Sequence, residues 1–187
     1  MRKGKGFTLL ELIFTVSILS LLIGLIAPNF KSFIAAIRVD NEITTLHRFL
    51  TYARNIAINK QVSVVVCPLN KSNKCTEDWH KELSIFTDLD FDETFEPKQK
   101  ELLLRVKPEI KLGDKLEYGL RRKRVAFGPN GRTIGWGSNG TFRYCPFEFK
   151  TLSRGIIVSV SGRSYISSDY NNDGYDENRR RKKITCR

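Results

Sequence analysis

The chain has 187 residues, enough for one compact domain and an anchoring segment but too few for two full domains. Its composition, 41% hydrophobic and 11% aromatic, excludes a disordered chain. The 32 basic residues exceed the 20 acidic ones by 12, a charge that favours anionic partners such as nucleic acid or lipid head groups. Four cysteines and two histidines leave little for a catalytic or zinc site built on those residue types.

The strongest signal lies at the N-terminus. Residues 7–27 form an apolar run with a single charged residue, Glu11. As a helix, this run would be about 31 Å long, close to the thickness of the hydrocarbon core of a bilayer. The basic residues Arg2, Lys3 and Lys5 precede it and should stay cytoplasmic. Because the run is longer than the apolar region of a signal peptide, the sequence predicts an uncleaved membrane span.

Glu11 needs a partner in such a helix. An acid costs about 2.5–3.5 kcal/mol at the centre of a membrane helix and less near the interface. If a protease cut the chain after Gly6, the new amino group of Phe7 would be a cation at the same depth. Glu11 of one subunit could then pair with the amino group of another.

The string Gly6-Phe7-Thr8-Leu9-Leu10-Glu11 resembles the prepilin-peptidase site of type IV pilins and pseudopilins. In that family cleavage follows the glycine, the new N-terminal phenylalanine is N-methylated, and a glutamate occupies the fifth mature position. The resemblance therefore implies prepilin peptidase as a partner and assigns processing and methylation to Gly6, Phe7 and Glu11.

Helical periodicity continues beyond the apolar run. Apolar residues recur every three or four positions and predict an amphipathic helix up to Lys60: Ile43, Leu46, Leu50, Ala53 and Ala57. After Gln61 the pattern becomes strand-like, with Gly, Asn and Pro turns between the segments. The expected strands are 62–67, 83–87, 102–106, 124–127, 141–145 and 155–161, the last continuing toward Ile166. The fold class is α+β, a long N-terminal helix packed on an antiparallel β-sheet head.

Within this plan the resemblance narrows to the GspH/FimT branch of minor pilins and pseudopilins. It rests on residues 53–58 followed by 64–68, on Cys75 and Trp79 ahead of 85–88, on Phe127, Pro129 and Gly131 ahead of 140–145, and on 158–163 and Cys186. Glu82 departs from the branch, which tends to have glycine after the tryptophan. The resemblance implies a type IV pilin-like organisation: a leader at 1–6, the transmembrane part of the helix at 7–27, its periplasmic part at 28–60 and a β-rich head with a disulfide-tied tail at 61–187.

The resemblance also implies a location. The protein is expected in the bacterial inner membrane as a single-pass protein with a cytoplasmic N-terminus and a periplasmic head, and on the cell surface after assembly with other pilins or pseudopilins. An oxidising compartment favours disulfides, and four cysteines permit three pairings. We expect Cys67–Cys75 and Cys145–Cys186. Zinc is disfavoured because the sequence lacks a Cys-x-x-Cys pair and its histidines are scattered.

Two acidic clusters invite a calcium assignment. Residues 169–174 begin like an EF-hand loop, but Arg180 stands where a bidentate glutamate is needed. Residues 88–92 lack the required glycine, and Gln99 occupies their twelfth position. We interpret both as solvated turns, with a weak calcium site as the alternative. We expect no bound metal and no cofactor. We also expect no enzymatic activity, because no nucleophile has an evident base partner in the sequence.

Charge is distributed unevenly along the predicted head. Residues 76–101 contain nine acids and three bases, whereas residues 121–166 contain nine bases and one acid. Arginines interleaved with the aromatic residues Trp136, Tyr144, Tyr165 and Tyr170 suit phosphate binding and base stacking. The candidate DNA-binding residues are Arg121, Arg122, Lys123, Arg124, Arg143, Arg163, Arg179, Arg180, Arg181, Lys182 and Lys183. A Cys145–Cys186 bond would bring the tail cations near Arg143 and form a single basic patch.

Three functions compete. The favoured one is a minor pilin of a type IV pilus that binds DNA non-specifically for uptake in natural transformation. The alternatives are a structural minor pilin that primes pilus assembly and a type II secretion pseudopilin that works in protein export. DNA-binding members of the branch share a Gly-Arg-x-Arg motif, of which Gly162-Arg163-Ser164-Tyr165 has only the first half.

Overall fold

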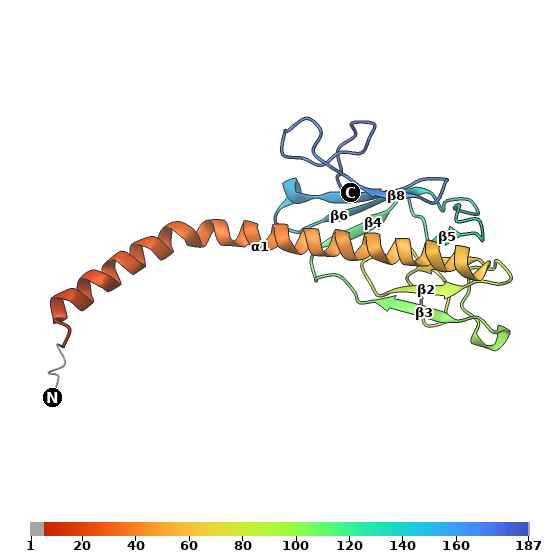
Figure 1. The fold of residues 1–187 in the computed structure, drawn as a ribbon, viewed down its shortest axis with the longest axis horizontal. Helices are drawn as coiled ribbons and strands as arrows, with labels where there is room; N and C mark the ends of the chain where they lie inside the picture. The colour runs from red at the N-terminus through yellow and green to blue at the C-terminus, as the bar shows by residue number, and fades with distance from the viewer. Residues whose placement is uncertain (1–5, 187) are drawn as a thin grey trace. The chain divides into compact units, whose positions relative to one another are not determined.

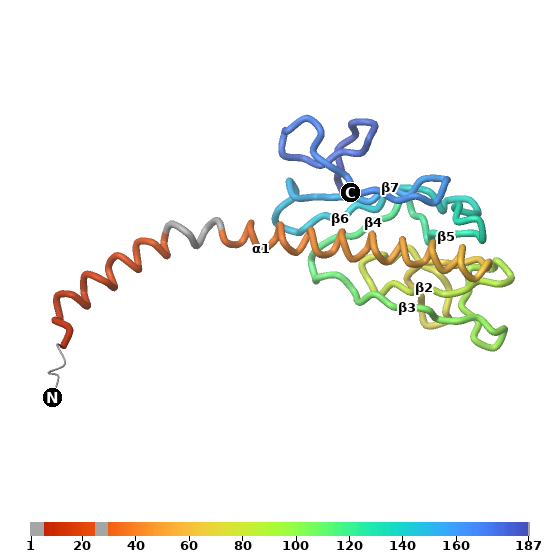
Figure 2. The backbone as a smooth tube through the Cα atoms, in the orientation of Figure 1, coloured from red at the N-terminus to blue at the C-terminus, as the bar shows by residue number. Residues whose placement is uncertain are grey.

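The computed structural model describes residues 6–186, with side chains for residues 6–24 and 30–186. The chain divides into two compact units, residues 1–37 and residues 38–187. One helix, α1 (Leu9–Lys60), runs through both. Figure 2 traces the backbone with the uncertain residues in grey. Residues 1–5 of the expected leader lie outside the described part.

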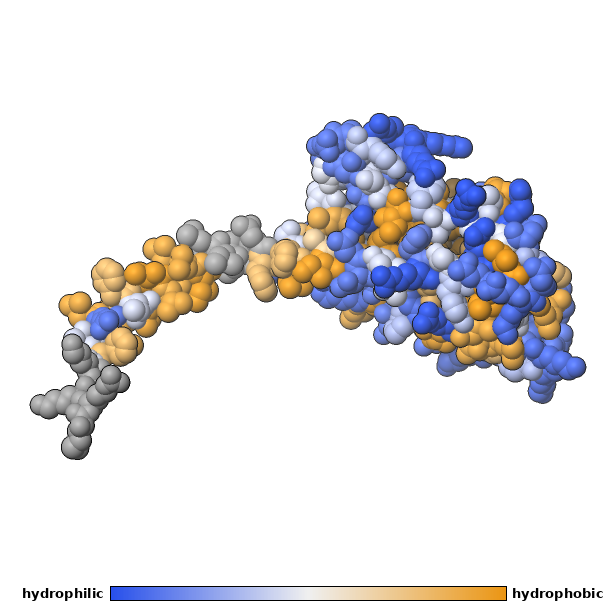
Figure 3. All heavy atoms as spheres, viewed as in Figure 1, coloured by the Kyte–Doolittle hydropathy of each residue, from blue (hydrophilic) through white to orange (hydrophobic). Residues whose placement is uncertain are grey.

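The first unit is helical from Leu9 onward, and its described side chains at 9–24 and 30–34 are mainly apolar and exposed in this single chain, whereas Ala35 is buried. Figure 3 shows them in orange. Among the described residues, no helix has the length and apolarity needed to cross a membrane. The expected span at 7–27 reaches residues 25–27, whose side chains are not described. It stays a prediction from the sequence.

The second unit contains two four-stranded sheets in which every neighbouring pair is antiparallel. The first sheet has the order β3-β2-β1-β5 and is built from β1 (Val64–Cys67), β2 (Leu83–Thr87), β3 (Leu103–Lys107) and β5 (Val125–Phe127). The second has the order β4-β6-β7-β8 and is built from β4 (Lys115–Tyr118), β6 (Gly140–Cys145), β7 (Arg154–Val158) and β8 (Ser164–Ile166). Short 3-10 helices occupy Pro97–Gln99 and Lys150–Leu152.

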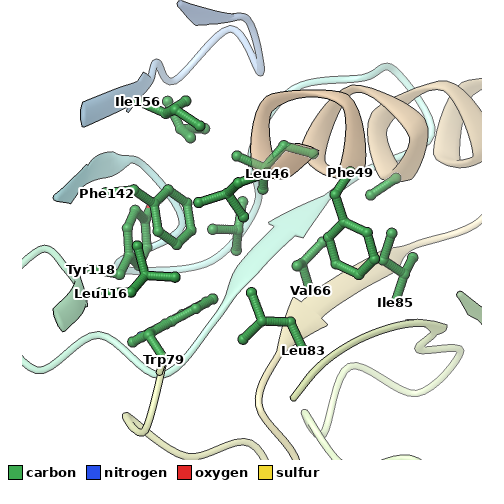
Figure 4. Packing of buried hydrophobic residues seen from close by; sticks show 14 of the residues in the cluster. Leu46, Phe49, Val66, Trp79, Leu83, Ile85, Leu116, Tyr118, Phe142 and Ile156 are labelled. Atoms are coloured by element: carbon green, nitrogen blue, oxygen red, sulfur yellow. The ribbon is translucent and has the colours of Figure 1, made fainter. Parts of the chain in front are cut away.

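The C-terminal half of α1 lies along both sheets, with β2 and β3 on one side and β4, β6 and β8 on the other (Figure 1). All five apolar positions predicted for its inner face are buried, at 2% exposure or less. In Figure 4 Leu46 lies between Phe142 of the second sheet and Phe49 of the helix. Phe49 lies beside Val66 and Ile85 of the first sheet. The helical period in the sequence therefore identified the buried face correctly.

An aromatic cluster fills the core beneath the second sheet. Trp79 contacts Tyr118 and Phe142 edge-on, with ring centroids 5.2 and 5.0 Å away, and those two rings stack at 4.1 Å. The Trp79 indole N–H donates to the Arg122 carbonyl oxygen at 2.6 Å, which satisfies its one polar atom. This bond fixes the loop after β4 to the core.

Buried charges also join α1 to the strands. Asp114, whose side chain is 1% exposed, accepts hydrogen bonds from Arg38 Nε at 2.9 Å, from the Phe147 N–H at 3.0 Å and from the Tyr144 hydroxyl. Burial and the bond to Asp114 raise the pKa of Tyr144 far above its ordinary value, so this tyrosine stays neutral.

Three expectations about the strands were wrong. The head has two sheets instead of one, because β5 pairs with β1 and not with β6, whose neighbours are β4 and β7. The segment Lys115–Tyr118, which was not predicted as a strand, forms one edge of the second sheet. The run expected from 155 to 161 and onward is two strands. Gly162 adopts a φ of +76° between them, a conformation that turns the chain back to pair β8 with β7. Strand β1 also starts later than expected, because Gln61 ends the helix with a φ of +55°.

Candidate functional site

The predicted processing junction lies outside the helix. Gly6 and Phe7 precede the first helical residue, and Phe7 is 84% exposed. Thr8 caps the helix, because its Oγ1 accepts the Glu11 N–H at 3.2 Å. The sequence Thr8-x-x-Glu11 has the form of a capping box, a signal that the sequence reading overlooked. The helix therefore begins after this cap, and the Gly6–Phe7 bond lies in the non-helical chain before it.

Both expected disulfides are present. Cys67 pairs with Cys75 across eight positions, and Cys145 pairs with Cys186 across 41. No described cysteine is free. The second bond joins the tail to the last residue of β6.

A basic cleft forms where the chain passes from β4 to β5. Arg121, Arg122, Lys123 and Arg124 line it together with Glu93, Trp136 and Gly137, around a volume of about 320 Å³. The four cations were all predicted as DNA-binding residues, and the structure brings them together.

The four cations of the cleft have different roles. Arg122 donates to the Gly137 carbonyl at 3.2 Å, and Arg124 pairs with Glu93 at 2.5 Å and donates to Ser138 Oγ at 3.1 Å. Both are partly buried, and their bonds hold the loops of the cleft together. The side chains of Arg121 and Lys123 are exposed to solvent.

Trp136 was noted among the aromatics of the basic half but not placed in the predicted site. It is 91% exposed and lines the same cleft as the four cations. Its neighbours Gly135 and Gly137 have φ angles of +70° and +88°, so the indole stands on a turn that only glycines adopt readily. The Gly-Trp-Gly triplet is the sequence signal that would have identified it. Tyr144, by contrast, is buried against Asp114 and presents no ring for stacking.

Three of the tail cations contact aromatic or acidic side chains of the tail or of β8. Arg179 lies over the Tyr165 ring at 4.2 Å, Arg181 over Tyr170 at 5.2 Å, and Lys183 pairs with Asp173 at 2.7 Å. The bond to Lys183 lowers the pKa of Asp173, and the same bond raises the pKa of Lys183. Figure 2 shows the tail as dark blue loops that extend from the second sheet. Figure 3 shows hydrophilic residues over the same loops.

The predicted single patch of tail cations and Arg143 is not found. Cys186 Sγ does lie 3.6 Å from the Arg143 carbonyl oxygen. However, the Arg143 guanidinium pairs with Glu117 of β4 at 3.7 Å, whereas Arg179 lies over Tyr165 of β8. Strands β4 and β8 are the two opposite edges of the sheet, so the charged ends face different edges.

Arg163 belongs neither to the cations of the cleft nor to those of the tail. It is exposed in the turn between β7 and β8. That turn packs on the loop after β5, where Gly162 approaches the Gly131 carbonyl and the Thr133 N–H donates to the Val160 carbonyl at 3.2 Å.

The acidic residues after β2 form a second cluster. Asp88 and Glu101 are almost fully buried, at 2% and 3% exposure. Burial, with the neighbouring charge of Glu101, raises the pKa of Asp88 to about 6. The sequence predicts a solvated turn at residues 88–92, which is wrong for Asp88, whereas Asp90 and Asp92 are exposed.

Comparison with known proteins identifies the family. The model of the type II transport protein GspH matches residues 42–162, and that of the prokaryotic N-terminal methylation motif matches residues 1–27. The chain belongs to the GspH/FimT family of type IV pilin-like proteins. Its role is that of a minor pilin or pseudopilin, a structural type of subunit that assembles with other pilins after prepilin-peptidase processing. No curated protein matches the chain.

Two solved structures share the fold of this GspH/FimT protein. Both are crystal structures of the type IV minor pilin FimU of Pseudomonas aeruginosa, with TM-scores of 0.53. Sequence identities are 22% and 21%, and the matches cover 69% of this chain and 92% and 90% of the FimU chains. The shared architecture is a long helix on an antiparallel β-rich head.

Proposed function

We propose that this chain is a minor pilin of a type IV pilus that binds DNA without strong sequence preference. In this proposal, prepilin peptidase removes residues 1–6, Phe7 is N-methylated, and the helix anchors the subunit in the inner membrane before it enters a filament. The head would then bind DNA for uptake in natural transformation.

The observation that carries the DNA-binding part is the exposed indole of Trp136 beside Arg121 and Lys123. A base stacked on an aromatic side chain contributes about 1–3 kcal/mol, and neighbouring cations attract the phosphates whatever the sequence. Arg122 and Arg124 support the arrangement, because their bonds to Gly137 and Glu93 fix the two walls of the cleft.

Tryptophan fluorescence tests this site directly. The chain has two tryptophans, and the other one, Trp79, is 1% exposed within the core. Single-stranded DNA added to the full-length protein in detergent should quench the Trp136 emission in a saturable manner. A Trp136→Phe variant should lose the quenching and keep part of the affinity, because a smaller ring remains. Quenching that persists in this variant, or none in the wild type, would argue against the cleft.

A type II secretion pseudopilin is the second candidate. The family model that matches residues 42–162 is named for a type II transport protein, which favours this host system. Deletion of the gene separates the two proposals. Loss of pili or of transformation supports the minor pilin, whereas retention of a secreted protein in the periplasm supports the pseudopilin.

A further inference from the structure

The acidic loop between β2 and β3 contains more buried negative charge than its surroundings neutralise. Carboxylate oxygens of Asp88, Asp90 and Glu101 lie within 4.8 Å of one another, and those of Asp90, Asp92 and Glu96 form a second such group. Two charged neighbours act on the Asp88 carboxyl. Both of them, Glu101 and Asp90, are acidic.

One atom in this cluster lacks a partner. Asp88 Oδ1 is buried and has no hydrogen-bond donor within the described structure, and the residue as a whole is 2% exposed. A buried carboxylate oxygen without a partner is costly, and native proteins normally satisfy it with a donor, a water or a metal ion. This observation is independent of the clustering of the acids.

The loop is held in place around the cluster. Glu101 accepts the Leu89 N–H on one oxygen and the Glu96 N–H on the other, both at 2.8 Å, so it ties the start of the loop to its end. Asp92 accepts the Thr94 N–H at 2.7 Å. The carboxylates are therefore positioned by backbone bonds before any ligand arrives.

We propose that Asp88, Asp90 and Glu101 form a calcium site, with Asp92 and Glu96 at its outer edge. Calcium takes six to eight oxygen ligands at about 2.3–2.6 Å, so two of its ligands lie at most about 5 Å apart, as these oxygens do. The ion would give the buried Asp88 carboxylate a further partner and would neutralise the buried pair of Asp88 and Glu101. Magnesium fits less well, because it needs a near-ideal octahedron and gives up water reluctantly. This site replaces the expectation of a solvated turn and does not rest on DNA binding.

Calorimetry on the full-length protein in detergent, first stripped of metal with a chelator, tests the site. Calcium chloride should give saturable binding of one ion, with a dissociation constant of about 10⁻⁵–10⁻³ M. At a free calcium concentration ten times the dissociation constant, the melting temperature of the head should rise by about 3–5 °C. Magnesium should bind at least tenfold more weakly.

Variants make the test specific. Asp90 is exposed, so Asp90→Asn should leave the fold intact while weakening calcium binding at least tenfold. Asp78→Asn, which removes a partly exposed acid that pairs with Lys81 outside the loop, is the control and should change the affinity less than twofold. Asp88→Asn should abolish the calcium-dependent rise in melting temperature without lowering the melting temperature of the metal-free protein.

Three results would overturn the proposal. One is no saturable heat and no change in melting temperature at about 10 mM calcium, above the weakest range known for such sites. Another is an equal effect of Asp78→Asn and Asp90→Asn. The third is a calcium-dependent rise in melting temperature that persists in the Asp88→Asn variant.

Discussion

Loss of the Cys145–Cys186 bond should destabilise the head more than loss of the Cys67–Cys75 bond. The first joins residues 41 positions apart and the second joins residues eight apart. In the chain-entropy model, these loops correspond to about 4 and about 2.6 kcal/mol of stabilisation. Paired Cys→Ser variants, unfolded in urea under non-reducing conditions, should therefore differ by about 1.4 kcal/mol in this order.

The same variants should differ in the tail. Ile184 is 3% exposed, and Arg154 bonds Asp176 at 3.1 Å, but most other residues of the tail are polar. Without the second disulfide, trypsin should cleave faster within Arg179–Lys183. The Cys67→Ser/Cys75→Ser variant should show the wild-type cleavage rate there. Equal losses of stability in both variants, or an unchanged cleavage rate without Cys186, would refute the reasoning.

Three further predictions concern processing, assembly and the buried charge. Gly6→Val should block leader removal by crowding the scissile bond, and mass spectrometry of wild-type protein from a peptidase-competent host should give N-methylated Phe7 as the first residue. Glu11→Ala should leave the head folded and reduce incorporation into sheared filaments, since its proposed partner lies in another subunit. Asp114→Asn should cost about 3 kcal/mol in urea unfolding, because Arg38 loses its buried counter-charge.

The helix could be predicted from the sequence because its signal is local. Ile43, Leu46 and Leu50 repeat with the helical period, and each is buried where the period places it. The division into two sheets could not be predicted, because it depends on the pairing of β5 with β1, which lies far earlier in the chain. The edge strand β4 was missed for another reason. Strand β4 has only four residues, two of them charged, and its pairing with β6 joins segments that are far apart in the chain.

For the candidate site, the sequence predicted only which residue types are present and not how they are arranged. The excess of cations in residues 121–124 was visible, but their separate roles were not. Arg124 is held by Glu93, and Arg122 by the Gly137 carbonyl, so both depend on contacts between distant loops. Burial of Asp88 was missed for the same reason, since the residue that ties its loop, Glu101, lies 13 positions further along the chain.

The most direct test of the account is a DNA titration of the full-length protein at several salt concentrations. We predict micromolar affinity near physiological salt and a slope of log affinity against log salt of about −4 to −5 on duplex DNA. Arg121→Gln/Lys123→Gln should flatten the slope by about 2, because two phosphate contacts are lost. The matched tail variant, Arg180→Gln/Lys182→Gln, should have the smaller effect. No binding at tens of micromolar protein in low salt would contradict DNA binding and leave a purely structural minor pilin.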